Sequence, residues 1–273
     1  FLIPSYLFWS SGIHKDGLNF SAIGIVFWLF HQGLQSRFTF KNIFLIIILL
    51  FLIFGLRNFI FFIVVINLTA WYLSHKTGKT KLVFAAIYFF GLMLFFASSN
   101  FSPKINFPKY IVIKHQEFSQ LSGRSEFSTK ELQPTLKSFI AYLPTALDIA
   151  LLRPHSDEIK NKSYLLAFIE NALFGIFIFI SFFHRKRNIS IPVVFWVCWL
   201  FALSILIIEG YTITFLGAIV RYKSLAIPFI ITPILALLDI EKLQKNLKRI
   251  KLRIKCSWID WINWINYFFE RSI

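Results

Sequence analysis

The chain has 273 residues, of which 57% are hydrophobic, and it carries a formal net charge of +16 at pH 7. This apolar share is too high for a soluble domain, so we predict an all-α, polytopic transmembrane helix bundle. In such a protein the basic residues of short loops report topology, and the charge therefore does not indicate binding to nucleic acid. Because the first residue is Phe1 and not methionine, we expect further spans upstream.

Seven hydrophobic segments follow one another along the chain, and a full crossing needs about 20 apolar residues. The second and third segments are short, and Gly55 and Arg57 lie where they join, which predicts a tight helical hairpin or two half-depth helices. The predicted spans are 18–30, 43–54, 59–73, 82–98, 164–183, 191–208 and 225–238.

Orientation follows from the basic residues of alternate connections, those after the first, third, fifth and seventh spans. The positive-inside rule places these connections in the cytoplasm, together with the C-terminus. Residues 1–17 and the connections at 55–58, 99–163 and 209–224 then lie outside. We divide the chain into spans one to four with the outer N-terminal motif (1–98), an extracytoplasmic loop (99–163), spans five to seven (164–238) and a cytoplasmic tail (239–273).

The long outer loop is polar over 117–133, which predicts irregular structure. Apolar residues then recur at helical spacing from Leu136 to Leu151, and Pro144 interrupts them. This pattern predicts two short amphipathic helices that lie at the membrane interface or cap a cavity, or a loop that packs passively on the bundle.

The tail contains seven lysines and arginines between residues 242 and 255, followed by Trp258, Trp261 and Trp264. A basic stretch beside an aromatic stripe predicts an amphipathic C-terminal helix that lies on the anionic lipids of the inner leaflet through residues 242–269. Binding to another partner is the alternative.

Cations on the outer side are not required by topology, and four outer connections carry them. The short ones contain Lys15, Arg57, Arg221 and Lys223, and the long loop contains Arg153. Arginine and lysine together suit a phosphate or diphosphate, one as a planar fork and the other as a point charge. The alternatives are that Arg57 snorkels to lipid headgroups and that 209–223 forms an aromatic and basic belt.

Three residues are candidates for acid–base chemistry. His14 could act as a general base near neutral pH, and Asp16 could orient a partner or simply favour the start of the first span. Glu209 is a further carboxyl, and Tyr222 or Tyr211 could stack on a sugar ring. No phosphate-binding loop, zinc-protease motif or nucleophile elbow occurs, and we expect no metal or cofactor.

Short motifs resemble those of bacterial membrane proteins that assemble surface polysaccharides. The motif Pro4-Ser5-x-x-Phe8-Trp9-Ser10-Ser11-Gly12-x-x-Lys15-Asp16 resembles a segment of uncharacterised Bacteroidetes-type members, which are similar in layout to Wzy-like O-antigen polymerases and GT-C-type glycosyltransferases. Two further stretches resemble the same group, Gly217-Ala218-Ile219-Val220-Arg221-Tyr222-Lys223 and the segment from Pro144-x-Ala146-Leu147 to Arg153-Pro154.

The resemblance implies an inner-membrane glycan polymerase or glycosyltransferase that acts on undecaprenyl-linked sugars at the extracytoplasmic face. Outer cations would hold the diphosphate while a hydroxyl of another glycan attacks, and Arg57, Arg221 and Lys223, with Arg153 behind them, match that role. The acidic residue that GT-C enzymes carry in their first outer loop has no counterpart after Phe1, so the catalytic base stays open among Asp16, Glu209 and His14.

Two other classes of function use the same features. A transporter or flippase for an anionic lipid or glycolipid would use the outer cations as a transit site. A non-catalytic scaffold of the same assembly would tolerate their replacement.

Overall fold

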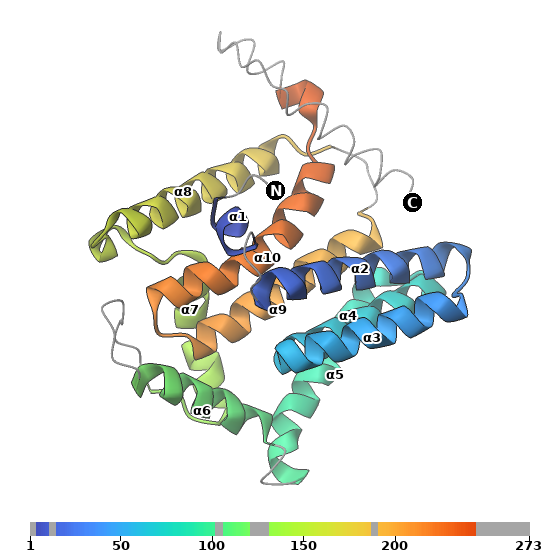
Figure 1. The fold of residues 1–273 in the computed structure, drawn as a ribbon, viewed down its shortest axis with the longest axis horizontal. Helices are drawn as coiled ribbons and strands as arrows, with labels where there is room; N and C mark the ends of the chain where they lie inside the picture. Colours follow the sequence, from blue (N-terminus) through green and yellow to red (C-terminus); the bar gives the residue numbers. More distant parts are fainter. Residues whose placement is uncertain (1–3, 11–14, 102–105, 121–130, 187–190, 244–273) are drawn as a thin grey trace.

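The computed structural model describes residues 4–10, 15–101, 106–120, 131–186 and 191–243 (Figure 1). Over these residues the chain consists of α-helices with one 3₁₀ turn at Ser156–Glu158 and no β-strand, so the all-α prediction is confirmed for this part. The helices are α1 (Pro4–Ser10), α2 (Lys15–Ser36), α3 (Phe40–Leu56), α4 (Asn58–Thr77), α5 (Thr80–Phe101), α6 (Phe107–Gln120), α7 (Leu136–Leu151), α8 (Lys162–Phe183), α9 (Val193–Thr212) and α10 (Leu216–Ala236).

Six helices are long and apolar enough to cross a membrane, namely α2, α4, α5, α8, α9 and α10. They indicate a multi-pass membrane protein, as the composition predicts. The predicted second span corresponds to α3, which is apolar but has only 17 residues. Arg57 alone connects α3 to α4, at the break where the sequence predicted a hairpin.

Helix α9 lies at the centre of the bundle and contacts α4, α6, α7 and α10. Aromatic rings from three helices meet in the core beside it: Phe201 lies 5.4 Å from Phe27 and 4.8 Å from Phe229 between ring centroids. Helix α8 lies at the far edge of the bundle from α3 (Figure 1), and most residues of α5 and α8 are exposed in the isolated chain. Their apolar surfaces suit contact with lipid.

The predicted outer loop at 209–224 is mostly helical in the structure. Helix α9 continues to Thr212 and α10 already begins at Leu216, so only three residues separate the two helices. Hydropathy placed the end of α9 too early and the start of α10 too late because the segment between them is rich in polar residues. These polar residues are accommodated in helices because their side chains form hydrogen bonds or line a cavity at the end of the bundle, as described below.

Helix α7 runs unbroken from Leu136 to Leu151 through Pro144, so the prediction of two short helices is wrong. A proline inside a helix costs about 3 kcal/mol because it removes a hydrogen bond and crowds the preceding turn. Burial of Tyr142 and Ala146 on either side holds α7 against α9 and offsets this cost. Of the region predicted to be irregular, residues 117–120 belong to α6.

Several predictions concern residues outside the described part of the chain. These are His14, the middle of the outer loop at 121–130, and the basic and tryptophan-rich tail from residue 244 onward. They stay predictions.

Candidate functional site

A cavity of about 320 Å³ lies at one end of the bundle. It is bordered by the start of α2, the α3–α4 connection, the end of α9 and the start of α10. Helix α6 forms its remaining wall. Four cations from four parts of the chain line the cavity, and Glu209 is its only carboxyl among the described residues. The lining residues are Lys15, Leu56, Arg57, Asn58, Phe59, Tyr110, Ile111, Lys114, Phe118, Ile208, Glu209, Thr212, Ile213, Arg221 and Tyr222.

Asp16 joins two of these cations into a charged cluster. Its side chain is 6% exposed, and it accepts hydrogen bonds from Nη2 of Arg57 and from Nε of Arg221, the latter at 2.6 Å. The first turn of α2 suits a carboxylate because the backbone dipole is positive there. The start of α2, the α3–α4 connection and α10 thereby meet at one buried carboxylate. We call Asp16, Arg57 and Arg221 the arginine cluster.

Aromatic rings lie against both guanidinium groups. The Cζ atom of Arg57 lies 4.0 Å from the ring centroid of Tyr222, and that of Arg221 lies 5.2 Å from the ring of Trp9. Such contacts stabilise a cation and also fix the plane of the guanidinium. The N–H groups that Asp16 does not use have no hydrogen-bond partner within the described residues. The cluster can therefore receive an anion along the edges of two oriented forks.

Glu209 lies in the last turn of α9 and lines the cavity next to this cluster. It is 4% exposed, and its Oε1 atom has no hydrogen-bond partner in the part of the chain that the structure describes. The next residue, Gly210, allows the close approach of α7, since a Cβ atom there would lie 2.0 Å from the carbonyl oxygen of Ala146. A buried carboxyl that no protein group engages is available to a proton or to a ligand in the cavity.

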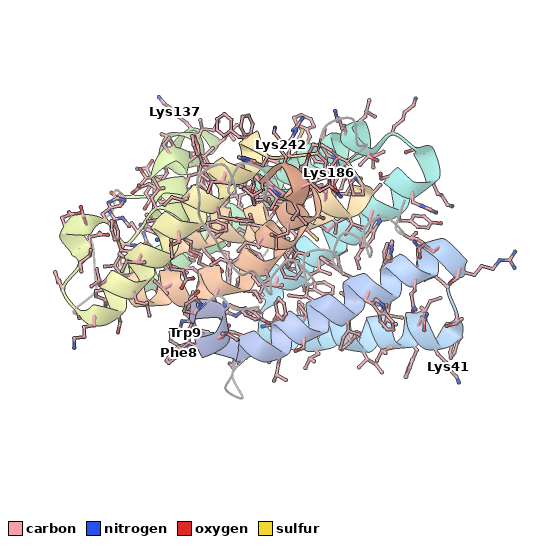
Figure 2. The ribbon with its side chains drawn as sticks, turned by 90° about the horizontal axis from the view of Figure 1, so that it is seen from above. Phe8, Trp9, Lys41, Lys137, Lys186 and Lys242 are labelled. Carbon is pink, nitrogen blue, oxygen red and sulfur yellow. The ribbon has the colours of Figure 1, made fainter. Side chains whose placement is uncertain are left out.

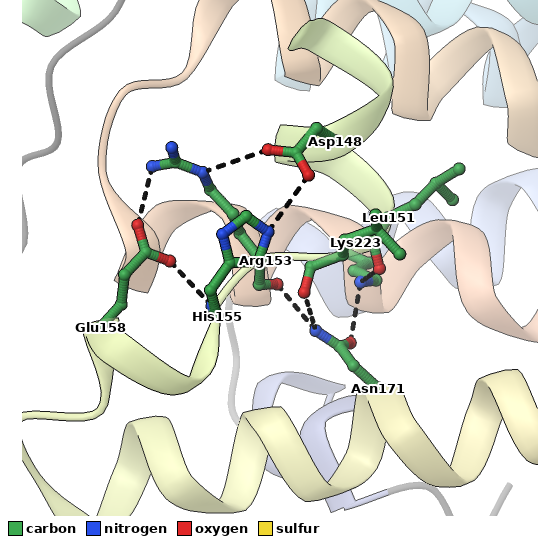
Figure 3. Close-up of polar contacts among 8 residues, drawn as sticks. Asp148, Leu151, Arg153, His155, Glu158, Asn171 and Lys223 are labelled. Atoms are coloured by element: carbon green, nitrogen blue, oxygen red, sulfur yellow. Dashed lines mark hydrogen bonds and ion pairs between the residues drawn. The ribbon is translucent and has the colours of Figure 1, made fainter. Parts of the chain in front are cut away.

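Two of the predicted cations belong to a separate polar network behind the cavity (Figure 3). The amine of Lys223 is buried and donates to the carbonyl of Leu151 at 2.7 Å and to Oδ1 of Asn171 at 2.8 Å. The guanidinium of Arg153 pairs with Glu158 at 2.8 Å and with Asp148 at 3.6 Å. Neither residue is among those that line the cavity.

The separation of Arg221 from Lys223 follows from their helical conformation. Each residue of an α-helix is turned by about 100° from the one before, so residues two apart point in nearly opposite directions. In a loop the two side chains could converge on one ligand, as the sequence suggested. On α10 one faces the cavity and the other faces α7 and α8.

The structure thus brings together six of the ten residues proposed from the sequence at one site. Lys15, Arg57, Glu209, Arg221 and Tyr222 line the cavity, and Asp16 holds two of them. Of the other four, Arg153 and Lys223 lie in the second network, and Tyr211 is buried, with its hydroxyl donating to the carbonyl of Phe139 at 2.7 Å. His14 is outside the described residues.

Sequence reasoning missed the contribution of α6 to the cavity. Tyr110, Lys114 and Phe118 all line it, and their spacing of four residues is a helical signal that the polar composition of this segment concealed. The hydrogen bond from Lys114 to Glu117, at 2.5 Å, raises the pKa of this lysine. Within the described residues no group of three or more metal-ligating side chains occurs.

Comparison with known proteins gives no further guide to the site. No protein-family model, curated protein or solved structure matches the chain.

Proposed function

We propose that the protein is an integral membrane glycosyltransferase that transfers glycan from an isoprenoid diphosphate, such as an undecaprenyl-linked sugar, at the extracytoplasmic face of a bacterial inner membrane. The observation that carries this proposal is a cavity at the end of a membrane bundle that is lined by two oriented arginines and, next to them, by a buried carboxyl with an oxygen that has no hydrogen-bond partner in the described residues.

The orientation is supported by the distribution of cations along the bundle. Basic residues also gather at the helix ends opposite the cavity, where the positive-inside rule would place the cytoplasm. Lys41 lies at the opposite end of the α2–α3 pair from Phe8 and Trp9 (Figure 2). The basic residues at these ends are Arg37, Lys41, Lys76, Lys79, Lys81, Arg185, Lys186 and Lys242. The cavity end would then face outward.

Seven crossings are supported by the contact of Asp16 with Arg57. Asp16 lies at the start of α2 and Arg57 directly follows α3, so α3 returns the chain to the end from which α2 departs. A helix of 17 residues is about 25 Å long, close to the hydrocarbon thickness of about 30 Å. Helix α3 therefore serves as the seventh span of the proposed topology.

The charge on the arginine side of the cavity matches a diphosphate diester. Arg57 and Arg221 pair with one carboxylate, Asp16, and Lys15 also lines the cavity, so these four residues carry an excess of two positive charges. A diphosphate that links an isoprenoid to a sugar carries one negative charge on each phosphate group. The exposed position of Lys15 and the one-third exposure of the Arg221 side chain leave both accessible to such a ligand.

The reaction assigns different tasks to the two sides of the cavity. A hydroxyl of the acceptor glycan attacks the anomeric carbon of the donor, the bond from that carbon to the phosphate oxygen breaks, and the isoprenoid diphosphate leaves with the electron pair. Arg57 and Arg221 stabilise the charge that develops on the leaving oxygen. Glu209 accepts the proton of the attacking hydroxyl. Asp16 is a positioning residue because both of its oxygens are engaged by arginines.

The proposal is tested with purified protein in liposomes that contain an undecaprenyl-diphosphate-linked glycan. Arg57→Gln and Arg221→Gln are each expected to weaken binding of undecaprenyl diphosphate by about 10–100-fold, since a hydrogen bond to a charged group contributes about 1.5–3 kcal/mol. Lys79→Gln, an exposed cation at the other end of the bundle, is the matched control. Arg221→Lys retains the charge and shows whether a loss comes from misfolding.

The same assay separates the classes of function. Glycan elongation that stops in both arginine variants supports the enzyme. Translocation of the lipid without formation of a glycosidic bond indicates a transporter, and elongation at the wild-type level in both variants contradicts the role of the arginine cluster.

A further inference from the structure

Helix α6 presents a second, chemically different wall to the cavity. Tyr110, Lys114 and Phe118 are spaced four residues apart, which places them on one side of the helix, and all three line the cavity. The neighbouring face of α6 is buried through Ile111 and His115. The helix is thus anchored beside the cavity while the two aromatic residues contribute to its lining.

The attachment of α6 places this wall beside Glu209. Nδ1 of His115 forms a hydrogen bond of 2.8 Å with the carbonyl oxygen of Tyr211, two residues after Glu209 on α9. Thr212, one residue further, also lines the cavity. Glu209 also interacts electrostatically with Arg57 and Asp16, so it lies between the aromatic side of α6 and the arginine cluster.

The α6 wall carries little net charge, in contrast to the arginine side. The amine of Lys114 bonds to the carboxylate of Glu117 at 2.5 Å and lies 5.6 Å from the ring centroid of Tyr110. Its charge is thus compensated within the helix. Glu209, which would have to be ionised to accept a proton, disfavours a carboxylate ligand nearby.

We infer that the α6 wall is the subsite for the acceptor, and that it takes an uncharged pyranose rather than a uronic or sialic acid. This inference rests on the proposed function, and it adds the class of acceptor. Tyr110 and Phe118 contact the apolar C–H faces of the sugar ring, and Thr212 hydrogen-bonds to a hydroxyl. The attacking hydroxyl then lies between Glu209 and the anomeric carbon held on the arginine side.

The size of the cavity limits what is recognised there. A volume of about 320 Å³ is at the lower end of ligand sites, which span about 300–1,000 Å³. The cavity can hold the reacting groups of the two substrates, while the isoprenoid tail and the remaining sugars of both glycans lie outside it. Recognition of the acceptor therefore depends on its terminal sugar.

The test is saturation-transfer NMR with the protein in lipid nanodiscs that contain undecaprenyl diphosphate. The probes are neutral methyl pyranosides, namely the glucoside, galactoside and N-acetylglucosaminide, and the methyl glucuronide as the acidic counterpart. At least one neutral glycoside is expected to bind, and the glucuronide to bind at least tenfold more weakly. Tyr110→Ala and Phe118→Ala should each weaken binding of the neutral glycoside by about 2–10-fold, the value of one aromatic contact. Ile113→Ala, on the same helix but outside the cavity lining, is the matched control.

The outcomes separate this inference from the proposed function. Normal binding of undecaprenyl diphosphate with no binding of any neutral glycoside, with equal binding of the glucuronide, or with no effect of the two aromatic substitutions overturns the acceptor subsite. Tyr110→Phe retains the ring and should restore binding, which excludes misfolding as the cause of the loss. Binding of undecaprenyl diphosphate that is insensitive to Arg57→Gln and Arg221→Gln overturns the proposed function itself.

Discussion

Replacement of Asp16 by asparagine removes the charge that joins α2 to the α3–α4 connection and to α10 at the end of the bundle. At a separation of about 4 Å and an effective dielectric constant near 20, each arginine gains about 4 kcal/mol of Coulomb energy from the carboxylate, before the cost of desolvation. Removing one partner of a buried ionic group typically costs about 3–5 kcal/mol, because the remaining charges are left uncompensated. Asp16→Asn should therefore lower the free energy of unfolding by about 3–5 kcal/mol, measured by denaturant titration in mixed micelles.

A double-mutant cycle isolates the contact from the general effect of the substitution. We expect Asp16→Asn and Arg57→Gln together to destabilise the protein by about 1–3 kcal/mol less than the sum of the single changes, a coupling usual for residues in one network. Glu117→Gln is the control, since its pair with Lys114 is exposed and such pairs contribute about 0.2–1 kcal/mol. Additivity within about 0.5 kcal/mol would refute the account of Asp16 as the link between the arginines.

Three further substitutions test the remaining parts of the site. Gly210→Ala should destabilise the protein by about 1–3 kcal/mol through its clash with the Ala146 carbonyl, whereas Gly217→Ala, with open space around it, should be neutral or slightly stabilising in the same unfolding titration. Lys223→Met should lower stability by about 1–3 kcal/mol, since two partly buried oxygens lose their donor. A change of more than threefold in undecaprenyl diphosphate binding would show that Lys223 also acts in the cavity. Glu209→Gln should slow glycan transfer by about 10²–10⁴-fold, while binding of undecaprenyl diphosphate and the stability of the protein stay at wild-type levels. Glycan transfer at the wild-type rate would show that Glu209 is not the base.

Much of the site could be predicted because topology places residues at one end of a bundle without any knowledge of contacts. The alternation of basic connections assigned Lys15, Arg57 and Arg221 to the same face, and the structure brings all three to one cavity. The same reasoning works for helices generally, since hydropathy and loop charge depend on the sequence alone. The topology prediction therefore tells at which end of the bundle a residue lies.

Hydropathy and loop charge do not predict how each helix is rotated about its own axis, and therefore do not predict which side chains face the cavity. Hydropathy could not tell whether α10 begins before or after Arg221, and without that boundary the opposite directions of Arg221 and Lys223 could not be foreseen. The contribution of α6 was missed for a related reason. Its cavity face contains one lysine between two aromatic residues, and only the packing of Ile111 and His115 shows which side turns inward.

The two polar networks at this end of the bundle differ in a way that explains why only one lines a cavity. In the second network the charges are matched within the protein: the Lys223 amine bonds to Leu151 and Asn171, and Arg153 forms ion pairs with two carboxylates. These internal contacts stabilise the junction of α7, α8 and α10 and leave no uncompensated charge to bind a ligand. In the arginine cluster a single carboxylate serves two guanidinium groups. Asp16 therefore fixes the positions of both arginines and leaves one positive charge in excess. An anion can bind to arginines that are already in place with little reorganisation of the protein.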